Sequence, residues 1–253
     1  MQLKRSDNLK IVCFDGIVLT DVNYGESSKI INVLSDKYGM IGVISKGCRN
    51  MKSKLRGVTH KLVYGTFNVY YKENGLSTLI SVDIKNSFSK IMNDLEKISF
   101  ATYLLDLTYQ VIKQSDSKEI YELLKNTLIK IEDGFNPLIL SNILELKYLD
   151  YLGVHPNIDN CCQCGSDKNI VTLSANEGGY ICKNCFTNQG YVLSQTIKTI
   201  RMYYYVDIKK IIKLDIEENV IKEINRFLDE YYDKYTGIYL KSKDFLNKIN
   251  QRV

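Results

Sequence analysis

Four cysteines are spaced as ligands for a metal ion. Cys161 and Cys164 form one CxxC pair, Cys182 and Cys185 form a second, and 17 residues separate the two pairs. A tight turn can hold both thiols of a CxxC pair toward one point, and two such pairs complete a tetrahedron around a thiophilic ion such as Zn²⁺. Because four thiolates leave no coordination position for water or substrate, the sequence predicts one structural zinc ion rather than a catalytic one.

The same thiols have alternative uses. A rubredoxin-like iron site takes the same four ligands, although the chain is larger than a simple electron carrier needs. Disulfides are disfavoured because the count of seven cysteines is odd and the chain opens on MQLKRSDNLK, without an apolar signal segment. Unligated cysteines are disfavoured because free thiols rarely fall into paired CxxC spacing. Cys162 adds a third thiol to the first pair and leaves open whether it can replace a ligand.

A concentration of positive charge is the second feature. Between Lys37 and Lys72 the chain has eight lysines and arginines and no acidic residue, a local charge of +8 in a chain of net charge +5. The rest of the chain is therefore slightly acidic, and the basic part is typical of a surface that binds a polyanion. Five of the cations lie in one glycine-flanked loop, KGCRNMKSKLRG: Lys46, Arg49, Lys52, Lys54 and Arg56.

This basic loop has the chemistry to bind a run of phosphates. Arginine can contact two phosphate oxygens at once, and lysine acts as a mobile point charge. The alternative is a solvated loop whose charge only aids solubility. Aromatic side chains nearby in the sequence are candidates for stacking on bases: Tyr38, Tyr64, Phe67, Tyr70 and Tyr71.

The part of the chain that carries the basic loop has the pattern of a small β-barrel. Five segments rich in β-branched and aromatic residues are separated by turns that contain glycine. Five strands of this length predict an OB-type barrel, with a small SH3-like barrel as the alternative. Gly16 and Gly65 fall inside strands, where sharp coiling favours glycine. The predicted strands are residues 11–22, 29–35, 40–45, 62–71 and 78–84.

Beyond residue 86 the spacing of apolar residues becomes helical. Helices are predicted over residues 94–112, from Asp116 to 131, and over 138–152, 196–205 and 217–235. The sequence therefore predicts an α+β protein with an OB domain at 1–85 and a helical domain at 86–253, interrupted by a zinc segment at 158–191. The longest apolar stretch, Ile98–Leu105, is too short to span a membrane, and we expect a cytoplasmic protein.

Motifs of catalysis are absent from the sequence. It has no GxGxxG or GxxxxGK[ST] phosphate loop, no HExxH and no GxSxG elbow. Only two histidines, His60 and His155, are available for acid–base chemistry. We therefore expect a binding protein rather than an enzyme.

With these parts in this order, the chain resembles the RecO recombination-mediator family of DNA repair proteins along nearly its whole length. The segments that carry the resemblance are GIVLTDVNYGESSKIINVLSDKYG, VISKGCRNMKSKLRG, LGVHPNIDNCCQCGS with GGYICKNC, and LKSKDFL. The resemblance implies an OB domain, a helical domain and an embedded zinc module with four cysteine ligands. It also implies binding of single- and double-stranded DNA, annealing of complementary strands, and work with RecR to load RecA onto strand coated by single-strand-binding protein.

The resemblance extends to individual residues. It implies metal binding by the four CxxC cysteines and DNA binding by the five cations of the basic loop, and it adds Lys29 in the second strand to the DNA-binding set. It also implies association with the nucleoid. Lys241 and Lys243 match a family segment, but the sequence assigns them no role. A different class of function stays open, that of a zinc-containing protein-interaction or transcription-associated module with incidental nucleic-acid binding.

Overall fold

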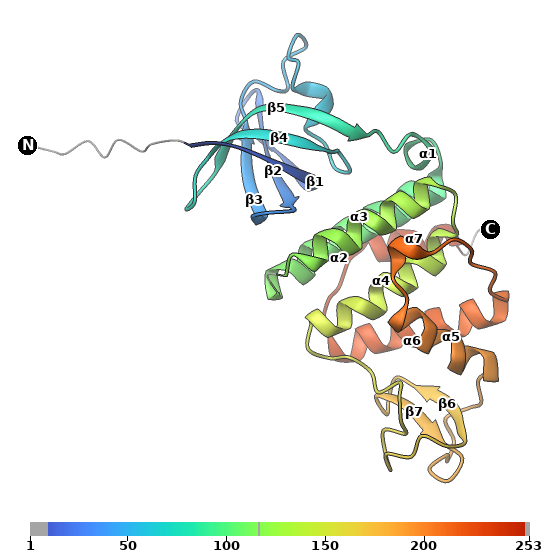
Figure 1. The fold of residues 1–253 in the computed structure, drawn as a ribbon. Coiled ribbons are helices and arrows are strands. Elements are labelled where there is room, and N and C mark those ends of the chain that lie inside the picture. The colour runs from blue at the N-terminus through green and yellow to red at the C-terminus, as the bar shows by residue number, and fades with distance from the viewer. Residues whose placement is uncertain (1–9, 116, 251–253) are drawn as a thin grey trace, which may run out of the picture. The chain divides into compact units, whose positions relative to one another are not determined.

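The computed structural model describes residues 10–115 and 117–250. These divide into two compact units, the first formed by residues 10–89 with 117–122 and the second by 90–115 with 123–250. Figure 1 shows the strands of a barrel in the first unit and the helices, with a small hairpin, in the second. Asp116, the predicted start of a helix, lies outside the described residues.

The first unit is a closed five-stranded barrel with strand order β1-β2-β3-β5-β4. Neighbouring strands are antiparallel except β3 and β5, which pair in parallel at Val43 with Ser77 and at Ile44 with Thr78. This confirms the predicted OB-like barrel. The strands are β1 (Lys10–Tyr24), β2 (Ser28–Ser35), β3 (Gly39–Ser45), β4 (Tyr64–Tyr71) and β5 (Ser77–Asn86).

Strand β1 closes the barrel because it is long enough to pair with two neighbours. Its first half pairs with β4 and its second half with β2, and the register shifts after Val18. The two strand glycines lie opposite each other across β1 and β4. A Cβ on Gly16 would lie 2.5 Å from Val33 Cγ1, and a Cβ on Gly65 would lie 2.6 Å from the carbonyl oxygen of Asp83. Both positions therefore require glycine.

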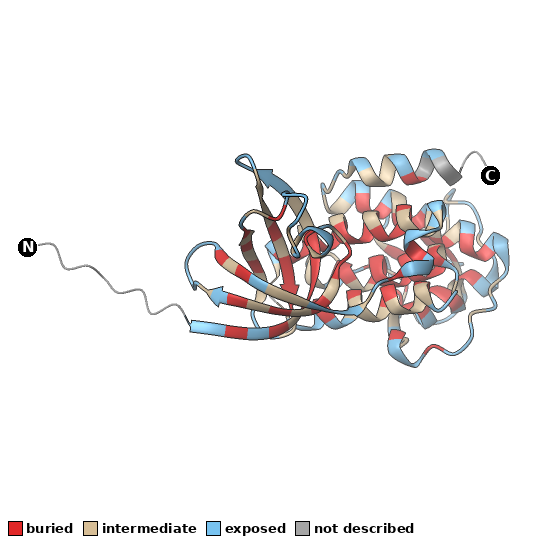
Figure 2. Ribbon diagram, turned by 90° about the horizontal axis from the view of Figure 1, so that it is seen from above, coloured by how far each residue is buried: buried red, intermediate tan, exposed pale blue. Residues whose placement is uncertain are grey.

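Alternation along the strands fills the barrel with apolar side chains, and Figure 2 marks the buried residues along these strands in red. The fully buried aromatic rings of Phe14 and Phe67 stack in this core with their centroids 5.8 Å apart. The other buried side chains of this core are aliphatic and come from all five strands and from Val63, just before β4; among them are Val18 and Ile31.

The second unit is built around α4, which is buried on nearly all sides and packs against α2, α5 and α6. The Asn136 side chain accepts hydrogen bonds from the backbone N–H groups of Leu138 and Ile139, and Pro137 occupies the first turn, so the start of α4 is fixed locally. The described helices are α1 (Ser89–Met92), α2 (Leu95–Gln114), α3 (Glu119–Glu132), α4 (Pro137–Tyr151), α5 (Ser194–Tyr205), α6 (Glu218–Tyr235) and α7 (Lys241–Asn250). None of them is long and apolar enough to cross a membrane.

A small hairpin lies between α4 and α5 in the chain, formed by β6 (Ile170–Ser174) and β7 (Gly179–Cys182). The turn before β7 is tied to the chain that follows α4, since Asn157 exchanges backbone hydrogen bonds with Gly178 and Tyr180 at 2.9 and 2.8 Å. A Cβ on Gly179 would collide with the Asn157 backbone, so glycine is required there too. This hairpin positions the second CxxC pair at the end of β7.

Candidate metal centre and nucleic-acid interface

The four cysteines of the CxxC pairs come together at the hairpin. All four sulfur atoms lie within 4.8 Å of one another. One pair lies in a turn in which the backbone N–H of Gly165 donates to Cys161 O at 2.8 Å, and the other follows β7, where the N–H of Cys185 donates to Cys182 O at 3.1 Å. Within residues 10–115 and 117–250, this is the only group of His, Cys, Asp and Glu side chains placed to share a metal ion.

The geometry of these thiols fits a four-thiolate metal site. Zinc–sulfur bonds of about 2.3 Å give a tetrahedron whose edges are about 3.8 Å, and Cys164 Sγ lies 3.6 Å from Cys182 Sγ. Burial raises the pKa of the Cys161 thiol, but hydrogen bonds from the backbone N–H groups of Cys182, Cys164 and Gln163 outweigh burial and lower that pKa to about 6. A thiolate stabilised in this way is the form that binds metal.

Cys162 lies outside the group of clustered sulfurs, although it is adjacent to Cys161 in the chain. Its backbone N–H donates to Tyr180 O at 2.8 Å, which fixes the turn against β7. Burial raises the pKa of its thiol. Cys162 therefore has a structural place beside the cluster that is distinct from that of the four ligand candidates.

The basic loop between β3 and β4 is a series of ordered turns. Backbone hydrogen bonds connect Asn50 to Gly47, Ser53 to Asn50, and Arg56 to Ser53, at 3.0 to 3.2 Å. Within the loop the Cys48 side chain is buried. Because the backbone is held at short intervals, the cations of the loop are preorganised.

The loop is also fixed to the turn between β1 and β2. The Arg49 N–H donates to Ser27 O at 2.8 Å, and the Gly47 N–H donates to the Ser28 hydroxyl at 3.2 Å. The Arg49 guanidinium adds a bond to Gly25 O at 3.2 Å. All five loop cations are exposed, and among the described residues no carboxylate forms an ion pair with any of them: Lys46, Arg49, Lys52, Lys54 and Arg56.

Lys29 differs from the five loop cations. Its ammonium lies 2.6 Å from Asp21 Oδ2 and donates to Thr59 O at 3.2 Å, and most of its side chain is buried. The charge is therefore balanced by Asp21, and the side chain holds Thr59, two residues beyond the basic loop, against β2.

The aromatic candidates are placed very differently from one another. Phe67 is core, Tyr64 stacks on Phe88, and Tyr38 packs against Tyr71 with ring centroids 5.1 Å apart. Tyr70 projects outward from β4. Two side chains that were not among the predicted candidates are more exposed than Tyr70.

These missed side chains are Tyr24, 53% exposed at the end of β1, and Met51, 84% exposed in the basic loop. Tyr24 precedes Gly25, whose carbonyl accepts a hydrogen bond from Arg49, so the backbone at Tyr24 lies next to the turn that contacts the loop. Only the contact between the β1–β2 turn and the loop places it there, and no spacing in the sequence signals that contact.

Comparison with known proteins agrees with both units. The family described as Recombination protein O N terminal matches residues 9–88, and the family described as Recombination protein O C terminal matches residues 92–244. Together these matches cover the barrel, helices α2 to α6 and the cysteine cluster.

Similar proteins share most of their length with this chain. The DNA repair protein RecO of Halalkalibacterium halodurans is 32% identical over 239 residues, which are 93% of this chain and 94% of the relative. The DNA repair protein RecO of Listeria monocytogenes serotype 4b (strain CLIP80459) is 31% identical over 241 residues, 94% of each chain. The DNA repair protein RecO of Bacillus pumilus is 32% identical over 93% of each chain. The chain therefore belongs to the RecO family of DNA repair proteins.

Proposed function

We propose that this protein is a recombination mediator that binds single- and double-stranded DNA through its basic loop, anneals complementary strands, and helps load the recombinase RecA onto strand coated by single-strand-binding protein. RecR is the expected protein partner. The observation that carries the proposal is a set of five exposed cations without ion-pair partners among the described residues, held by ordered turns on an OB-like barrel. Family membership supports the same function.

The loop is suited to the DNA backbone rather than to base sequence. Five cations that bind phosphates displace counterions from the DNA, which gives affinity without base readout. Neutralised strands repel each other less, and this allows two complementary strands to approach. Tyr24, which is exposed at the end of β1, is a candidate aromatic face on which a base can stack. DNA binding and strand annealing break no covalent bond, so we propose that this protein is not an enzyme. We propose that it acts in the cytoplasm, on the nucleoid.

We further propose that Cys161, Cys164, Cys182 and Cys185 hold one structural Zn²⁺. When bound, the ion would link the two turns of a segment, residues 158–191, that is too small to form its own apolar core. The proposed division into an OB domain at 1–85 and a helical domain at 86–253 assigns this segment and the DNA-binding loop to different domains.

The test is an annealing assay with complementary strands coated by the single-strand-binding protein of the same organism. We expect the protein to accelerate annealing and the acceleration to fade as salt is added. A variant with the five loop cations replaced by glutamine should no longer accelerate annealing. With about five phosphate contacts removed, the log–log salt slope for single-strand affinity should become less negative by about 3.5.

The matched control replaces five exposed lysines of the second unit by glutamine, so that the net charge changes equally: Lys198, Lys209, Lys210, Lys213 and Lys222. This control should keep most of the affinity. Equal losses in the two variants would show that net charge, not the loop, governs binding. No acceleration by folded wild-type protein would instead favour the protein-interaction function.

A further inference from the structure

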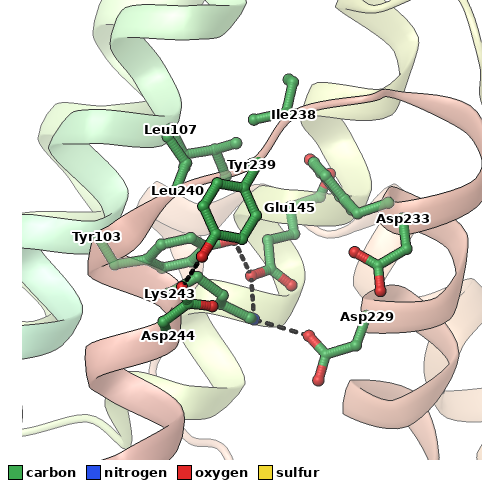
Figure 3. Close-up of a pocket in the computed structure, with 11 residues that line it drawn as sticks. Tyr103, Leu107, Glu145, Asp229, Asp233, Ile238, Tyr239, Leu240, Lys243 and Asp244 are labelled. Atoms are coloured by element: carbon green, nitrogen blue, oxygen red, sulfur yellow. Dashed lines mark hydrogen bonds and ion pairs between the residues drawn. The ribbon is translucent and has the colours of Figure 1, made fainter.

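A cavity of about 350 Å³ lies in the second unit among α2, α4, α6 and α7 (Figure 3). That volume is at the lower end of the range for small-molecule pockets. Its lining contains four carboxylates and one cation: Glu145, Asp229, Asp233, Asp244 and Lys243. The pocket therefore has a formal charge of −3, and it is separate from the cysteine cluster and the basic loop.

At the centre of the pocket is a buried carboxylate of which only one oxygen is hydrogen-bonded. Glu145 is 1% exposed, and its Oε1 accepts hydrogen bonds from the Tyr103 hydroxyl at 2.5 Å and from the Lys243 ammonium at 3.0 Å. Its Oε2 has no hydrogen-bond partner among the described residues. In Figure 3 this second oxygen is on the side that faces Asp229 and Asp233. A buried carboxylate oxygen without a donor is costly, so it marks the place where a ligand can donate.

Lys243 does not balance the remaining charge. Its ammonium is shared between Glu145 and Asp229, at 3.0 and 2.9 Å, and lies over the Tyr103 ring, 4.7 Å from the centroid. One cation thus serves two carboxylates, while Asp233 is exposed at the same cavity. One ammonium therefore does not neutralise the carboxylates of the pocket, and a second positive charge would be stabilised there.

The geometry limits which cation would fit. Among the described residues, no three of these carboxylates approach closely enough to share a metal ion. Larger organic cations can donate to several separated oxygens. The apolar side chains of Leu107, Ile238 and Leu240 line the rest of the cavity and suit an alkyl stem.

We propose that this pocket binds an ammonium or guanidinium group carried on an alkyl chain, held by Glu145, Asp229 and Asp233. Two sources supply this chemistry, a free polyamine and a basic side chain of a polypeptide. The proposal does not depend on DNA binding by the barrel, because none of its residues belongs to the basic loop.

The test is isothermal titration of the full chain, loaded with zinc and free of DNA, with two probes in separate experiments. The first probe is spermidine, and the second is a capped Gly-Arg-Gly peptide. We expect one saturable site for at least one probe. Asp233→Asn should weaken the affinity for that probe about tenfold, which corresponds to the loss of one charge-assisted contact.

Asp215→Asn is the matched control, because it removes one charge from an exposed carboxylate outside the pocket. Binding of spermidine alone would identify a polyamine site, and binding of the peptide alone a site for basic side chains. Absence of saturation with both probes at concentrations on the order of 10 mM would overturn the proposal. So would equal weakening by Asp215→Asn. Circular dichroism of each variant separates lost binding from lost folding.

Discussion

Lys243 shows how one residue can hold a helix that the sequence does not predict. It belongs to α7, and it forms ion pairs with Glu145 on α4 and Asp229 on α6. Burial lowers the pKa of Lys243, but the attraction of the two carboxylates is larger in sum and raises that pKa to about 12. The ammonium is therefore charged at neutral pH, and the family segment that received no role from the sequence has a structural one.

Replacing Lys243 by methionine should destabilise the second unit, because Glu145 would keep a buried charge without its cation. We expect a loss of about 3 kcal/mol in the free energy of unfolding at pH 7. Since the folded pKa is raised, this contribution is fully present below pH 10.5 and is lost as the pH rises through about 12. Urea unfolding measures the loss, and Lys248→Met, at an exposed position of the same helix, is the control. Equal stability of the two variants would contradict the role of the ion pairs.

At the scale of elements, the barrel depends on close approach of β4 to β5 at Gly65. Gly65→Val should cost about 1–3 kcal/mol, because the new side chain would meet the Asp83 backbone, which cannot move without breaking the strand pairing. Gly57→Ala is the control, since a Cβ there meets nothing within 4 Å. Thermal unfolding followed by circular dichroism compares them. A Gly65 variant as stable as the control would mean that the strands can separate at no cost.

The hairpin that carries the second CxxC pair should depend on its metal. Cys182→Ser removes one of the four clustered thiols, whereas Cys162→Ser removes the neighbouring thiol outside the cluster. We expect elemental analysis to find one zinc per chain in the wild type and in the Cys162 variant, and much less in the Cys182 variant. Amide exchange at Tyr180 and Ile181 should accelerate only in the Cys182 variant. Equal zinc loss in both would make Cys162 a ligand.

Elements that follow local patterns could be predicted from the sequence, and elements that depend on distant contacts could not. The five strands were predictable because apolar residues alternate between turns, as around Gly39, and the core helices because apolar spacing is regular. Helix α7 is mostly polar, and its anchor Glu145 lies 98 residues earlier in the chain. The CxxC spacing indicated which thiols meet. Nothing in the spacing of Tyr24 or Lys29 showed that one would be exposed and the other paired.

For the whole molecule, the basic loop and the cysteine cluster lie in different compact units. Removing zinc with a chelator should therefore unfold the zinc segment and leave single-strand DNA affinity nearly unchanged. Fluorescence anisotropy of a labelled oligonucleotide, before and after chelation, measures this. The control adds zinc back to restore the hairpin. A large fall in affinity on chelation would mean that the two units do not fold independently.

The first unit is not one continuous stretch of chain, since residues 117–122 belong with the barrel while residues 90–115 belong with the helices. A gene exchange at a single breakpoint near residue 89 would transfer the strands without that short segment. No single exchange between two genes can therefore transfer one whole unit without part of the other. A single breakpoint after residue 122 would keep the first unit whole but would divide the second unit, because residues 90–115 and 123–250 would then come from different parents.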